Sequence, residues 1–593
     1  MRSEKQVDAG TESFSEFIDG NCYYVDKTRF LRPVFATPGK VRLFTRPRRF
    51  GKTLTMNMFH EFLNLDFKNP GDTSRQERLF KDLDVMKDTE FVQKYMGQYP
   101  VVFMTLKSVF GETFENAVGK LASLIVYTAS NFDFLIQSPK LSDEEKEKFK
   151  LYLKENELVK PENSSRLTDF LRFISNALYK HFGRQVVLLI DEYDVPLAKA
   201  QIYGYHSRMV TLYAQFLDIL KSSGGIGETV NKIVMTGCLK VAKNSIFTGA
   251  NNFTANTVLS EDLTFSSFMG FTAGETKKFL DEFDLSEYAG LVKENYDGYR
   301  FFDQEIFCPW DVCSFISYAS PLKEAGRASI IKAKNYWIDT ENTGTRAIKG
   351  YVGFLSKSDN QNLQDLSDGK EITISVNDEL NYDMLSNHNV SDMWSVLLHT
   401  GYITAVEQIS RKEFSVRIPN KEIKECFDDS IQASFMETLT TDNKNYDILK
   451  ALSDGDTDKA RKLISGLLLS FISNRIYANK SRPENFYEGF MAGLLASFGE
   501  KLSDLKVEKE AGSGFADIRF RDVANDSAMV IELKVAKNAK EARLKAAQGI
   551  EQIEEKGYAR EFIEDLDVPN VSAVGIAFFD KDCVVVSKRL NLN

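Results

Sequence analysis

The sequence is poor in the residues that form disulfide frameworks and zinc sites. It contains six cysteines and five histidines among 593 residues, all dispersed along the chain. No CxxC pair occurs, and the two cysteines that lie close together, Cys308 and Cys313, have no histidine cluster beside them. Both kinds of site need closely spaced ligands. We therefore interpret the cysteines as reduced thiols, as is usual inside cells.

Long apolar runs are also missing. The most apolar stretches, such as Val186–Ile190 and Gly466–Ile472, are far shorter than the roughly 20 residues that a helix needs to cross a bilayer. The opening segment, MRSEKQVDAG, contains nothing that could act as a signal peptide. We therefore expect a soluble, cytoplasmic protein without a membrane segment.

The chain lacks internal repeats and low-complexity linkers, and its charge balance is acidic. A length of 593 residues exceeds what one hydrophobic core supports, so two to four domains are expected. Hydrophobic residues make up 43% and charged residues 27%, which is typical of globular proteins. The formal net charge of −10 argues against a protein coated in nucleic acid, so any contact with DNA or RNA must use a local basic groove.

The first part of the chain alternates short apolar runs with helical patterns. Near-continuous apolar runs are typical of buried parallel strands, and they lie at Val41–Thr45, Tyr99–Leu106, Gln185–Ile190 and Lys232–Thr236. Helical periodicity lies between them, as in Met209–Lys221. Strands that alternate with helices predict an α/β fold with a doubly wound parallel sheet.

The rest of the chain is less regular. Residues 271–375 look mostly helical. Asp378–Thr404 resembles two short helices followed by a strand, so residues 376–435 could form a winged-helix module. From residue 436 onward, helical segments lead into a strand-rich stretch, Val507–Val535, then a long charged helix, Ala536–Tyr558, and a final pair of strands. We expect a second α/β region with a mixed sheet there.

A phosphate-binding loop is predicted between the first strand and the following helix. In such a loop, consecutive backbone N–H groups and the helix N-terminus surround phosphate oxygens. Lys52 would reach the β- and γ-phosphates of ATP, the Thr53 hydroxyl would hold Mg²⁺, and Gly51 lets the backbone approach the phosphate. The predicted nucleotide-binding residues are Arg46, Pro47, Arg48, Arg49, Phe50, Gly51, Lys52 and Thr53. Because Arg46 stands where the consensus has its first glycine, this is a variant loop, and by itself it could be a basic helix start.

A second acidic element strengthens the nucleotide-binding interpretation. The strand Val186–Ile190 runs straight into Asp191 and Glu192. Asp191 would bind Mg²⁺ through water, and Glu192 would orient or deprotonate the attacking water. Thr236, at the end of another strand, is suitably placed to sense the γ-phosphate. Adjacent carboxylates can also mark a strand that merely reaches solvent, an alternative that the upstream loop disfavours.

A C-terminal hairpin is predicted to bring two carboxylates and a lysine together. Its strands, Phe515–Arg521 and Ala528–Val535, flank residues suited to a turn. A turn centred on residues 524–525 places Asp517 opposite Glu532, and one centred on residues 525–526 places it opposite Lys534. Side chains alternate between faces, so either register puts all three on one face.

These three side chains suit metal-dependent phosphodiester chemistry. Two carboxylates form a hard-oxygen site for Mg²⁺ or Mn²⁺, and a bound metal would lower the pKa of a water molecule and neutralise charge on the phosphodiester. Lys534 could orient that water or stabilise the pentavalent phosphate. Glu-x-Lys on a strand is also common on solvated faces, and this alternative stays open.

Several motifs together resemble the AAA-ATPase-like proteins of bacteria. They are YVDKTRFL (Tyr24–Leu31), RPRRFGKT, LLIDEYDVPL (Leu188–Leu197), TGCLKVAKNSIFTGANN (Thr236–Asn252), YDGYRF (Tyr296–Phe301) and CPWDV (Cys308–Val312). The resemblance spans nearly the whole chain. It implies an AAA-type fold with a helical lid, commonly joined to a C-terminal nuclease-superfamily domain of the PD-(D/E)xK type. Together with the possible winged-helix module at 376–435, this predicts an ATPase domain at 1–270, a lid at 271–375 and a nuclease-like domain at 436–593.

The resemblance also implies roles at the C-terminal site. It assigns metal binding to Asp517 and Glu532, and catalysis to these two residues together with Lys534. On the predicted helix Pro483–Phe498, Glu488 or Glu484 could supply an accessory metal ligand.

Two further positions follow from the same resemblance. Gln552 resembles the family's helix glutamine, which would contact the site or the nucleic-acid backbone. The family often has an arginine directly before the aspartate, whereas this chain has Ala516, and this departure bears on how the substrate backbone is bound.

The sequence thus predicts a protein that binds and hydrolyses ATP with Mg²⁺. Its C-terminal domain, using Mg²⁺ or Mn²⁺, would cleave DNA or RNA in defence or nucleic-acid processing. The alternative is a signalling or scaffold ATPase whose C-terminal domain only binds a partner or nucleic acid. A metabolic kinase fits less well, because the pair Asp191 and Glu192 suits water activation. No arginine finger can be chosen, because Arg49 and Arg300 are candidates on charge alone, and homo-oligomer formation stays open.

Overall fold

The computed structural model describes most of the chain. The described residues are 4–220, 226–240, 253–337, 355, 357–377, 380, 389–441, 445–470, 483–496, 502–511, 514–522, 526–566, 568–579 and 582–590. Two expected features lie outside them, namely the end of the TGCLKV motif at residues 241–252 and the hairpin turn at residues 523–525. None of the described helices is both long and apolar enough to span a bilayer.

The chain forms two compact units. The first comprises Met1–Thr340 and Thr373–Lys424, and the second comprises Glu341–Ile372 and Glu425–Asn593. The four parts implied by the resemblance remain a prediction, because compact units need not coincide with family domains.

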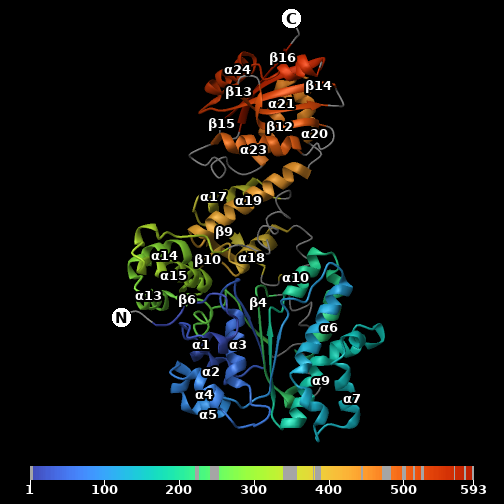
Figure 1. The fold of residues 1–593 in the computed structure, drawn as a ribbon, viewed down its shortest axis with the longest axis vertical. Coiled ribbons are helices and arrows are strands. Elements are labelled where there is room, and N and C mark those ends of the chain that lie inside the picture. The colour runs from blue at the N-terminus through green and yellow to red at the C-terminus, as the bar shows by residue number, and fades with distance from the viewer. Residues whose placement is uncertain are drawn as a thin grey trace. The chain divides into compact units, whose positions relative to one another are not determined.

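A five-stranded parallel sheet organises the first unit (Figure 1). Its order is β2-β3-β4-β1-β5, with β1 at Val41–Thr45, β2 at Val101–Thr105, β3 at Val186–Asp191, β4 at Val230–Gly237 and β5 at Phe253–Asn256. The first four strands were predicted from their apolar runs, and the predicted α/β class is confirmed. The short β5 was not predicted, because its sequence FTAN carries no apolar run. All neighbouring pairs are parallel, so the carboxyl ends of the strands meet at one edge.

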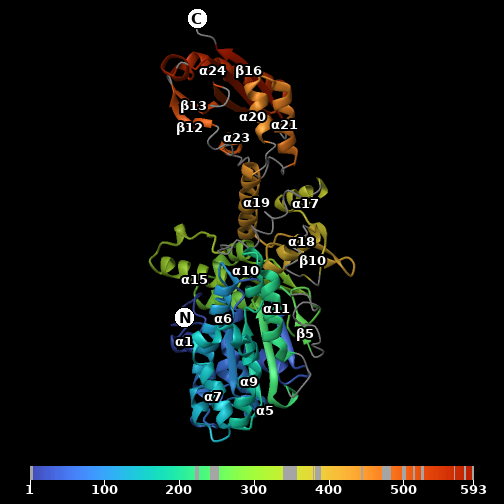
Figure 2. The ribbon, with the colours of Figure 1, turned by 90° about the vertical axis from the view of Figure 1, so that its right-hand side faces the viewer.

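Helices lie on both sides of this sheet, with α3 on one side and α6 and α9 on the other (Figure 1). Figure 2 shows α6, α7 and α9 as a group that runs alongside the strands. The described helices that come before β4 in the chain are α1 (Phe14–Asp19), α2 (Leu31–Phe35), α3 (Lys52–Leu63), α4 (Ser74–Phe80), α5 (Thr89–Tyr95), α6 (Phe114–Ser130), α7 (Asp143–Leu151), α8 (Glu155–Leu158), α9 (Ser164–Phe182), α10 (Val195–Ile202), α11 (His206–Phe216) and α12 (Ile226–Thr229).

The region expected to be a helical lid contains strands as well as helices. Its helices are α13 (Ala273–Glu282), α14 (Ala289–Tyr296) and α15 (Pro309–Glu324). A small antiparallel sheet of order β6-β8-β7 accompanies them, formed by β6 (Phe271–Thr272), β7 (Tyr299–Phe301) and β8 (Gln304–Phe307). Strands of two to four residues are too short to show a period of two, so hydrophobic periodicity could not indicate them.

The region expected to be a winged-helix module contains helix α18, a hairpin and the start of helix α19. Helix α18 (Val390–Thr400) is followed by β10 (Thr404–Gln408) and β11 (Glu413–Arg417), which form a sheet of order β10-β11-β9 with β9 (Ile372–Ser375). The first of the two expected helices falls largely on residues 378–388, outside the described residues except for Leu380. Helix α19 (Lys421–Thr441) follows and leads by sequence into the second unit.

The second unit is built on a five-stranded mixed sheet of order β12-β13-β14-β15-β16. The strands are β12 (Leu502–Ala511), β13 (Gly514–Asp522), β14 (Ser527–Val535), β15 (Asn570–Phe579) and β16 (Asp582–Leu590), and the helices are α17 (Lys357–Ser367), α20 (Asn445–Ser453), α21 (Thr457–Ser470), α23 (Pro483–Ala496) and α24 (Ala539–Lys556). Only β14 and β15 pair in parallel. The predicted mixed sheet, long charged helix and final strand pair are therefore present.

Two sets of helices cover the two faces of this second sheet. Ala542 and Ala546 of α24 cluster with Ala577 of β15, so α24 covers the face that Ala577 presents. The neighbouring residue Phe578 stacks on Tyr487 of α23 at 4.2 Å between ring centroids. Consecutive strand residues point to opposite faces, so α23 covers the other side.

Candidate functional site

The loop between β1 and α3 has the backbone conformation that a phosphate cradle needs. Arg49 and Gly51 both have positive φ, 69° and 76° respectively, and α3 begins immediately afterwards at Lys52. The intervening Phe50 is buried, and its ring packs edge-to-face on Tyr299 at 5.0 Å between centroids. The loop is thus held between the sheet and the β7–β8 hairpin while its backbone turns into the helix N-terminus.

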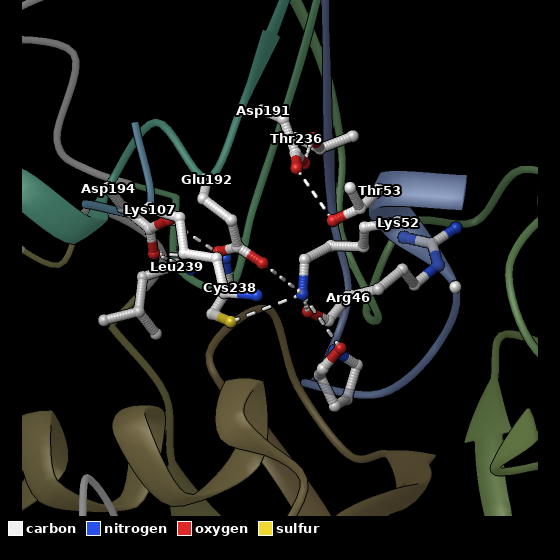
Figure 3. A network of polar contacts seen from close by, with 12 residues as sticks. Arg46, Lys52, Thr53, Lys107, Asp191, Glu192, Asp194, Thr236, Cys238 and Leu239 are labelled. Carbon is white, nitrogen blue, oxygen red and sulfur yellow. Dashed lines mark hydrogen bonds and ion pairs between the residues drawn. The ribbon is translucent and has the colours of Figure 1, made fainter. Parts of the chain in front are cut away.

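Three strand ends bring the predicted magnesium and sensor residues into contact (Figure 3). The Thr53 hydroxyl donates a 2.8 Å hydrogen bond to Oδ2 of Asp191, and the Thr236 hydroxyl donates to Oδ1 of the same carboxylate. Asp191 is fully buried. A hydroxyl and a carboxylate in contact are the hard oxygen donors that Mg²⁺ prefers, so these residues fit the metal of a nucleotide site.

Lys52 lies between the loop and the acidic strand end. Its Nζ donates to the carbonyl of Pro47 at 3.2 Å and stands 3.4 Å from Oε1 of Glu192. Its side chain is 4% exposed. Burial alone would lower the pKa of Lys52, but Cys238 at 3.6 Å and the nearby carboxylates raise it overall, so the ammonium stays charged. A buried, permanently positive lysine suits the stabilisation of phosphate charge.

The acidic strand end carries concentrated negative charge. Burial, followed by the charge of Glu192, raises the pKa of Asp191 to about 6. Glu192 itself adopts a positive φ of 51°, which is uncommon for a residue with a side chain. Such local strain is found at functional sites when the surrounding fold enforces it.

The structure assigns different roles to the residues of the loop. The Arg46 side chain is 1% exposed and turns away from the loop, where it donates to Asn256 Oδ1 at 2.6 Å and to the Phe265 carbonyl at 3.0 Å. The Arg49 guanidinium lies 4.7 Å from the centre of the Trp310 ring. Any part that Arg46 plays in a phosphate cradle is therefore limited to its backbone.

The arginine-finger candidates lie in different surroundings. Arg300 is exposed on β7, and its side chain donates to the Phe302 carbonyl at 3.1 Å. Arg49 donates to the Tyr336 carbonyl within the same unit.

Sequence reasoning missed Asp194, which organises the same edge of the sheet. Its carboxylate accepts hydrogen bonds from the backbone N–H groups of Cys238 at 3.1 Å and Leu239 at 2.9 Å (Figure 3). A Cβ on Gly237 would lie 2.4 Å from Asp194, so this position requires glycine. Asp194 therefore fixes the segment that follows Thr236. The only sequence signal was a second aspartate three residues after Asp191.

At the C-terminal site the register of the hairpin is resolved. Ile518 pairs with Ile531 and Arg519 with Val530, the register in which Asp517 stands opposite Glu532. The alternative, with Asp517 opposite Lys534, is excluded by this pairing. Glu532 and Lys534 pair with Gly575 and Ala577 of β15, on the face that α24 covers.

Lys534 contacts Glu532 directly, and Asp517 is hydrogen-bonded to the backbone of the neighbouring strand. Lys534 Nζ lies 2.7 Å from Oε1 of Glu532, and Oδ2 of Asp517 accepts a 2.7 Å hydrogen bond from the Leu533 N–H. Glu532 is 1% exposed, and within the described part of the chain its Oε2 is buried without a hydrogen-bond donor. Burial and then the charge of Asp517 raise the pKa of Glu532 to about 7. A buried carboxylate oxygen without a donor, beside a second carboxylate, fits a divalent cation.

Two glycines that sequence reasoning missed let α24 approach this site. A Cβ on Gly549 of α24 would lie 3.3 Å from the Cβ of Glu532, and a Cβ on Gly575 would stand 1.9 Å from the Ala546 carbonyl oxygen. The helix backbone thus rests directly on the sheet beside Glu532. Glycine within a helix and a strand carries no motif of its own, so a single sequence gives little sign of this contact.

The predicted accessory residues are not gathered around this pair. Gln552 donates a 3.4 Å hydrogen bond to the Tyr558 hydroxyl. Glu488 lies on α23, which packs on the opposite face of the sheet from Glu532, and the side chain of Glu484 lies outside the described residues. Among the residues that the structure describes, no three His, Cys, Asp or Glu side chains are arranged as a metal site. The roles of Gln552 and Glu488 therefore remain predictions.

Comparison with known proteins gives the family of each end of the chain. Residues 8–247 match the family described as Predicted AAA-ATPase, and residues 482–588 match the PD-(D/E)XK nuclease superfamily. The chain is also 22% identical over 582 residues to a protein of Azotobacter chroococcum mcd 1, described as an uncharacterized protein in the vnfD 5'region, and the match covers 94% of each chain. The two matched regions contain the β1–α3 loop and the C-terminal carboxylate pair respectively.

Proposed function

Given an AAA-ATPase-like region followed by a PD-(D/E)XK nuclease-superfamily region, we propose that this protein binds and hydrolyses ATP and cleaves nucleic-acid phosphodiesters with its C-terminal part. The observation that carries the proposal is the 2.8 Å contact of Thr53 with Asp191 beside the phosphate-binding loop. Such a hydroxyl–carboxylate pair is what Mg²⁺-ATP needs at a P-loop.

Each residue of the nucleotide site has a distinct task in this proposal. The N–H groups that precede α3 bind phosphate oxygens, and the Lys52 ammonium offsets their charge. Thr53 and Asp191 would hold Mg²⁺, which would supply positive charge next to the phosphates. Glu192 orients the attacking water and takes its proton. The Thr236 hydroxyl, which donates to Asp191 in this structure, would donate to a terminal phosphate instead.

The C-terminal site divides its tasks in a similar way. Asp517 and Glu532 are the proposed ligands of Mg²⁺ or Mn²⁺, which when bound would lower the pKa of a water molecule. Lys534, next to Glu532, orients that water or stabilises negative charge on the phosphate. Burial and the charge of Asp517 raise the pKa of Glu532 in spite of its contact with Lys534, so a divalent cation would relieve the repulsion between the two carboxylates.

The test is an ATPase and nuclease assay on the full chain and two variants. We expect Glu192→Gln to lose ATP hydrolysis and Asp517→Asn to lose nicking of supercoiled plasmid or cleavage of RNA in Mn²⁺. Loss of both activities in the matching variants supports the proposal. Equal activity of the wild type and Asp517→Asn would remove the nuclease half and leave the ATPase half standing.

The small number of possible metal ligands at the C-terminal site favours a second candidate function. Within the described residues only two carboxylates contribute to the C-terminal site, and Ala516 replaces the arginine common before the aspartate. In this alternative the chain is a signalling or scaffold ATPase whose C-terminal part binds nucleic acid or a partner without cleaving it. Nucleic-acid binding that persists in Mn²⁺ without any cleavage would favour it.

A further inference from the structure

Two sequence motifs without a part in the proposed chemistry support the phosphate-binding loop. The motif YDGYRF (Tyr296–Phe301) supplies Tyr299, on which Phe50 packs. The motif CPWDV (Cys308–Val312) supplies Trp310, on which the Arg49 guanidinium lies. Both motifs therefore contact side chains of the loop residues that directly precede Gly51.

The same two motifs hold the residues that begin α19. The Asn420 amide donates a 2.7 Å hydrogen bond to the Asp297 carbonyl, and its Oδ1 caps α19 by accepting from the Ile423 N–H at 2.9 Å. Gly298, with φ of 89°, lies so close to Pro419 that a Cβ there would stand 1.9 Å from the Pro419 carbonyl oxygen. The start of α19 is thus fixed to the elements that also support the loop.

At the centre of this junction two carboxyl groups face each other. Asp311 lies in the first turn of α15 and is 0% exposed, and Glu422 lies in the first turn of α19 and is 3% exposed. Both oxygens of Asp311 and Oε2 of Glu422 are buried without a hydrogen-bond donor among the described residues. Neighbouring buried carboxyl groups in this condition are satisfied only when one of them carries a proton and donates it to the other, because an ionised carboxylate is an acceptor alone.

Glu422 also holds the segment that Arg49 contacts. Its Oε1 accepts hydrogen bonds from the backbone N–H groups of Tyr336 and of Trp337, the latter at 2.6 Å. The Arg49 guanidinium donates to the carbonyl of the same Tyr336. A continuous set of contacts therefore runs from the loop through Tyr336 to Glu422 and Asp311, all within the first unit.

We propose that Asp311 and Glu422 share one proton. The shared proton holds Tyr336, Trp337 and the first turn of α19 against α15. This junction therefore responds both to pH and to phosphate bound at the loop. The second response rests on the proposed nucleotide-binding function. Phosphate oxygens compete for the Arg49 guanidinium, because arginine binds phosphate more strongly than a neutral carbonyl. When Arg49 leaves the Tyr336 carbonyl, the junction loses one of its supports and the start of α19 loosens.

The surroundings of the pair favour a retained proton. The charged and titratable groups that act on it from the neighbouring elements are Arg49, Tyr296, Cys308, Cys313 and Tyr336. Only Arg49 among them is a cation. Burial and then the charge of Asp311 raise the pKa of Glu422 to about 9, and burial raises the pKa of Asp311.

The sign of the pH effect follows from these raised pKa values. The folded chain holds the proton more tightly than the unfolded chain, so the stabilisation is complete below the ordinary carboxyl pKa. It is lost progressively as the pH rises towards 9. Glutamine at position 422 can accept the same two N–H bonds and donate to Asp311 without titrating, so Glu422→Gln should escape this loss.

The first arm of the test measures unfolding in urea for wild type, Glu422→Gln and Glu422→Ala. Tryptophan fluorescence reports on this unit, because Trp310, Trp337 and Trp394, the three tryptophans of the sequence, all lie in it. We expect the midpoint of Glu422→Gln to rise relative to wild type between pH 5 and pH 9, while Glu422→Ala unfolds at lower urea throughout. A difference between wild type and Glu422→Gln that is constant across this range overturns the shared proton.

The second arm measures amide hydrogen exchange with and without a non-hydrolysable ATP analogue and Mg²⁺, after binding has been measured separately. We expect the analogue to speed exchange at residues 336–337 and 421–425 about tenfold in wild type and in Glu422→Gln. Glu422→Ala should exchange fast in both states. Binding without a change in wild-type exchange, or an equal change in Glu422→Ala, overturns the link to the loop. Absence of analogue binding instead defeats the proposed nucleotide function, and the urea series still decides whether the proton is shared.

Discussion

The Thr53 hydroxyl donates a 2.8 Å hydrogen bond to Asp191, although 138 residues separate the two along the chain. The contact is set by strand register, because β4 lies between β1 and β3 and pairs Phe44 with Thr236 and Ile190 with Met235. The ends of the three strands are therefore level, and the first helical turn after β1 meets the carboxylate after β3. The sheet itself thus brings the two proposed magnesium ligands together.

Thr53→Ala should weaken ATP binding only when Mg²⁺ is present. The variant removes the hydroxyl that contacts Asp191 but keeps the backbone N–H groups and Lys52. We expect at least a tenfold loss of affinity in Mg²⁺ and little change in EDTA, measured by calorimetry. Thr211→Ala is the matched control, because the Thr211 hydroxyl bonds only the carbonyl of Ser207 in its own helix. An equal loss with and without Mg²⁺ would argue against a metal role for Thr53.

Glu192→Gln should separate ATP binding from ATP hydrolysis. Glutamine keeps the size of the side chain but cannot accept the proton of the attacking water. General base catalysis contributes roughly 100-fold to 10,000-fold to a rate, so the rate of phosphate release should fall by about that range. Affinity for ATP should change little. A variant that hydrolyses ATP at the wild-type rate would assign the proton to another group.

The fold was largely predictable because its central strands are buried and consist of nearly continuous runs of apolar residues. Four of the five strands of the first sheet follow from their apolar runs, whereas β5, Phe253–Asn256, lacks such a run and was missed. The hairpin around Asp517 was predicted with two registers. Side-chain alternation is the same in both, so only the structure could choose between them.

The sites were predictable to the extent that chemistry follows local spacing. Asp191, Thr53 and Thr236 lie together as expected because strand ends meet at one edge. The roles of Asp194 and Gly575 depend on distant partners, the Leu239 N–H and the Ala546 carbonyl. No local pattern encodes those partners, so a single sequence cannot assign these roles.

Removal of Lys534 or either carboxylate should abolish phosphodiester cleavage. Asp517→Asn, Glu532→Gln and Lys534→Ala each remove one group of a cluster whose members act together, so we expect losses of at least 100-fold that do not add in double variants. Plasmid nicking in Mn²⁺ is the measurement. Glu554→Gln is the matched control, because Glu554 pairs with Lys588 on the exposed side of α24. Cleavage that survives all three substitutions would place the activity elsewhere or in a contaminant.

Gly575→Ala should destabilise the second unit and disturb the site at Glu532. The added Cβ would stand 1.9 Å from the Ala546 carbonyl oxygen, a backbone atom that cannot move without lifting α24 from the sheet. Overpacking of this kind costs about 1–3 kcal/mol or more in the free energy of unfolding. Gly466→Ala on α21 is the matched control. Among the described residues, no atom outside the backbone of its own helix lies within 4 Å of its added Cβ, and alanine in a helix interior stabilises by about 0.5–1 kcal/mol relative to glycine. Urea unfolding followed by circular dichroism should therefore move in opposite directions for the two variants. A Gly575→Ala protein as stable as wild type would mean that α24 does not rest on β15 at Glu532, and the shielding of that carboxylate would need another cause.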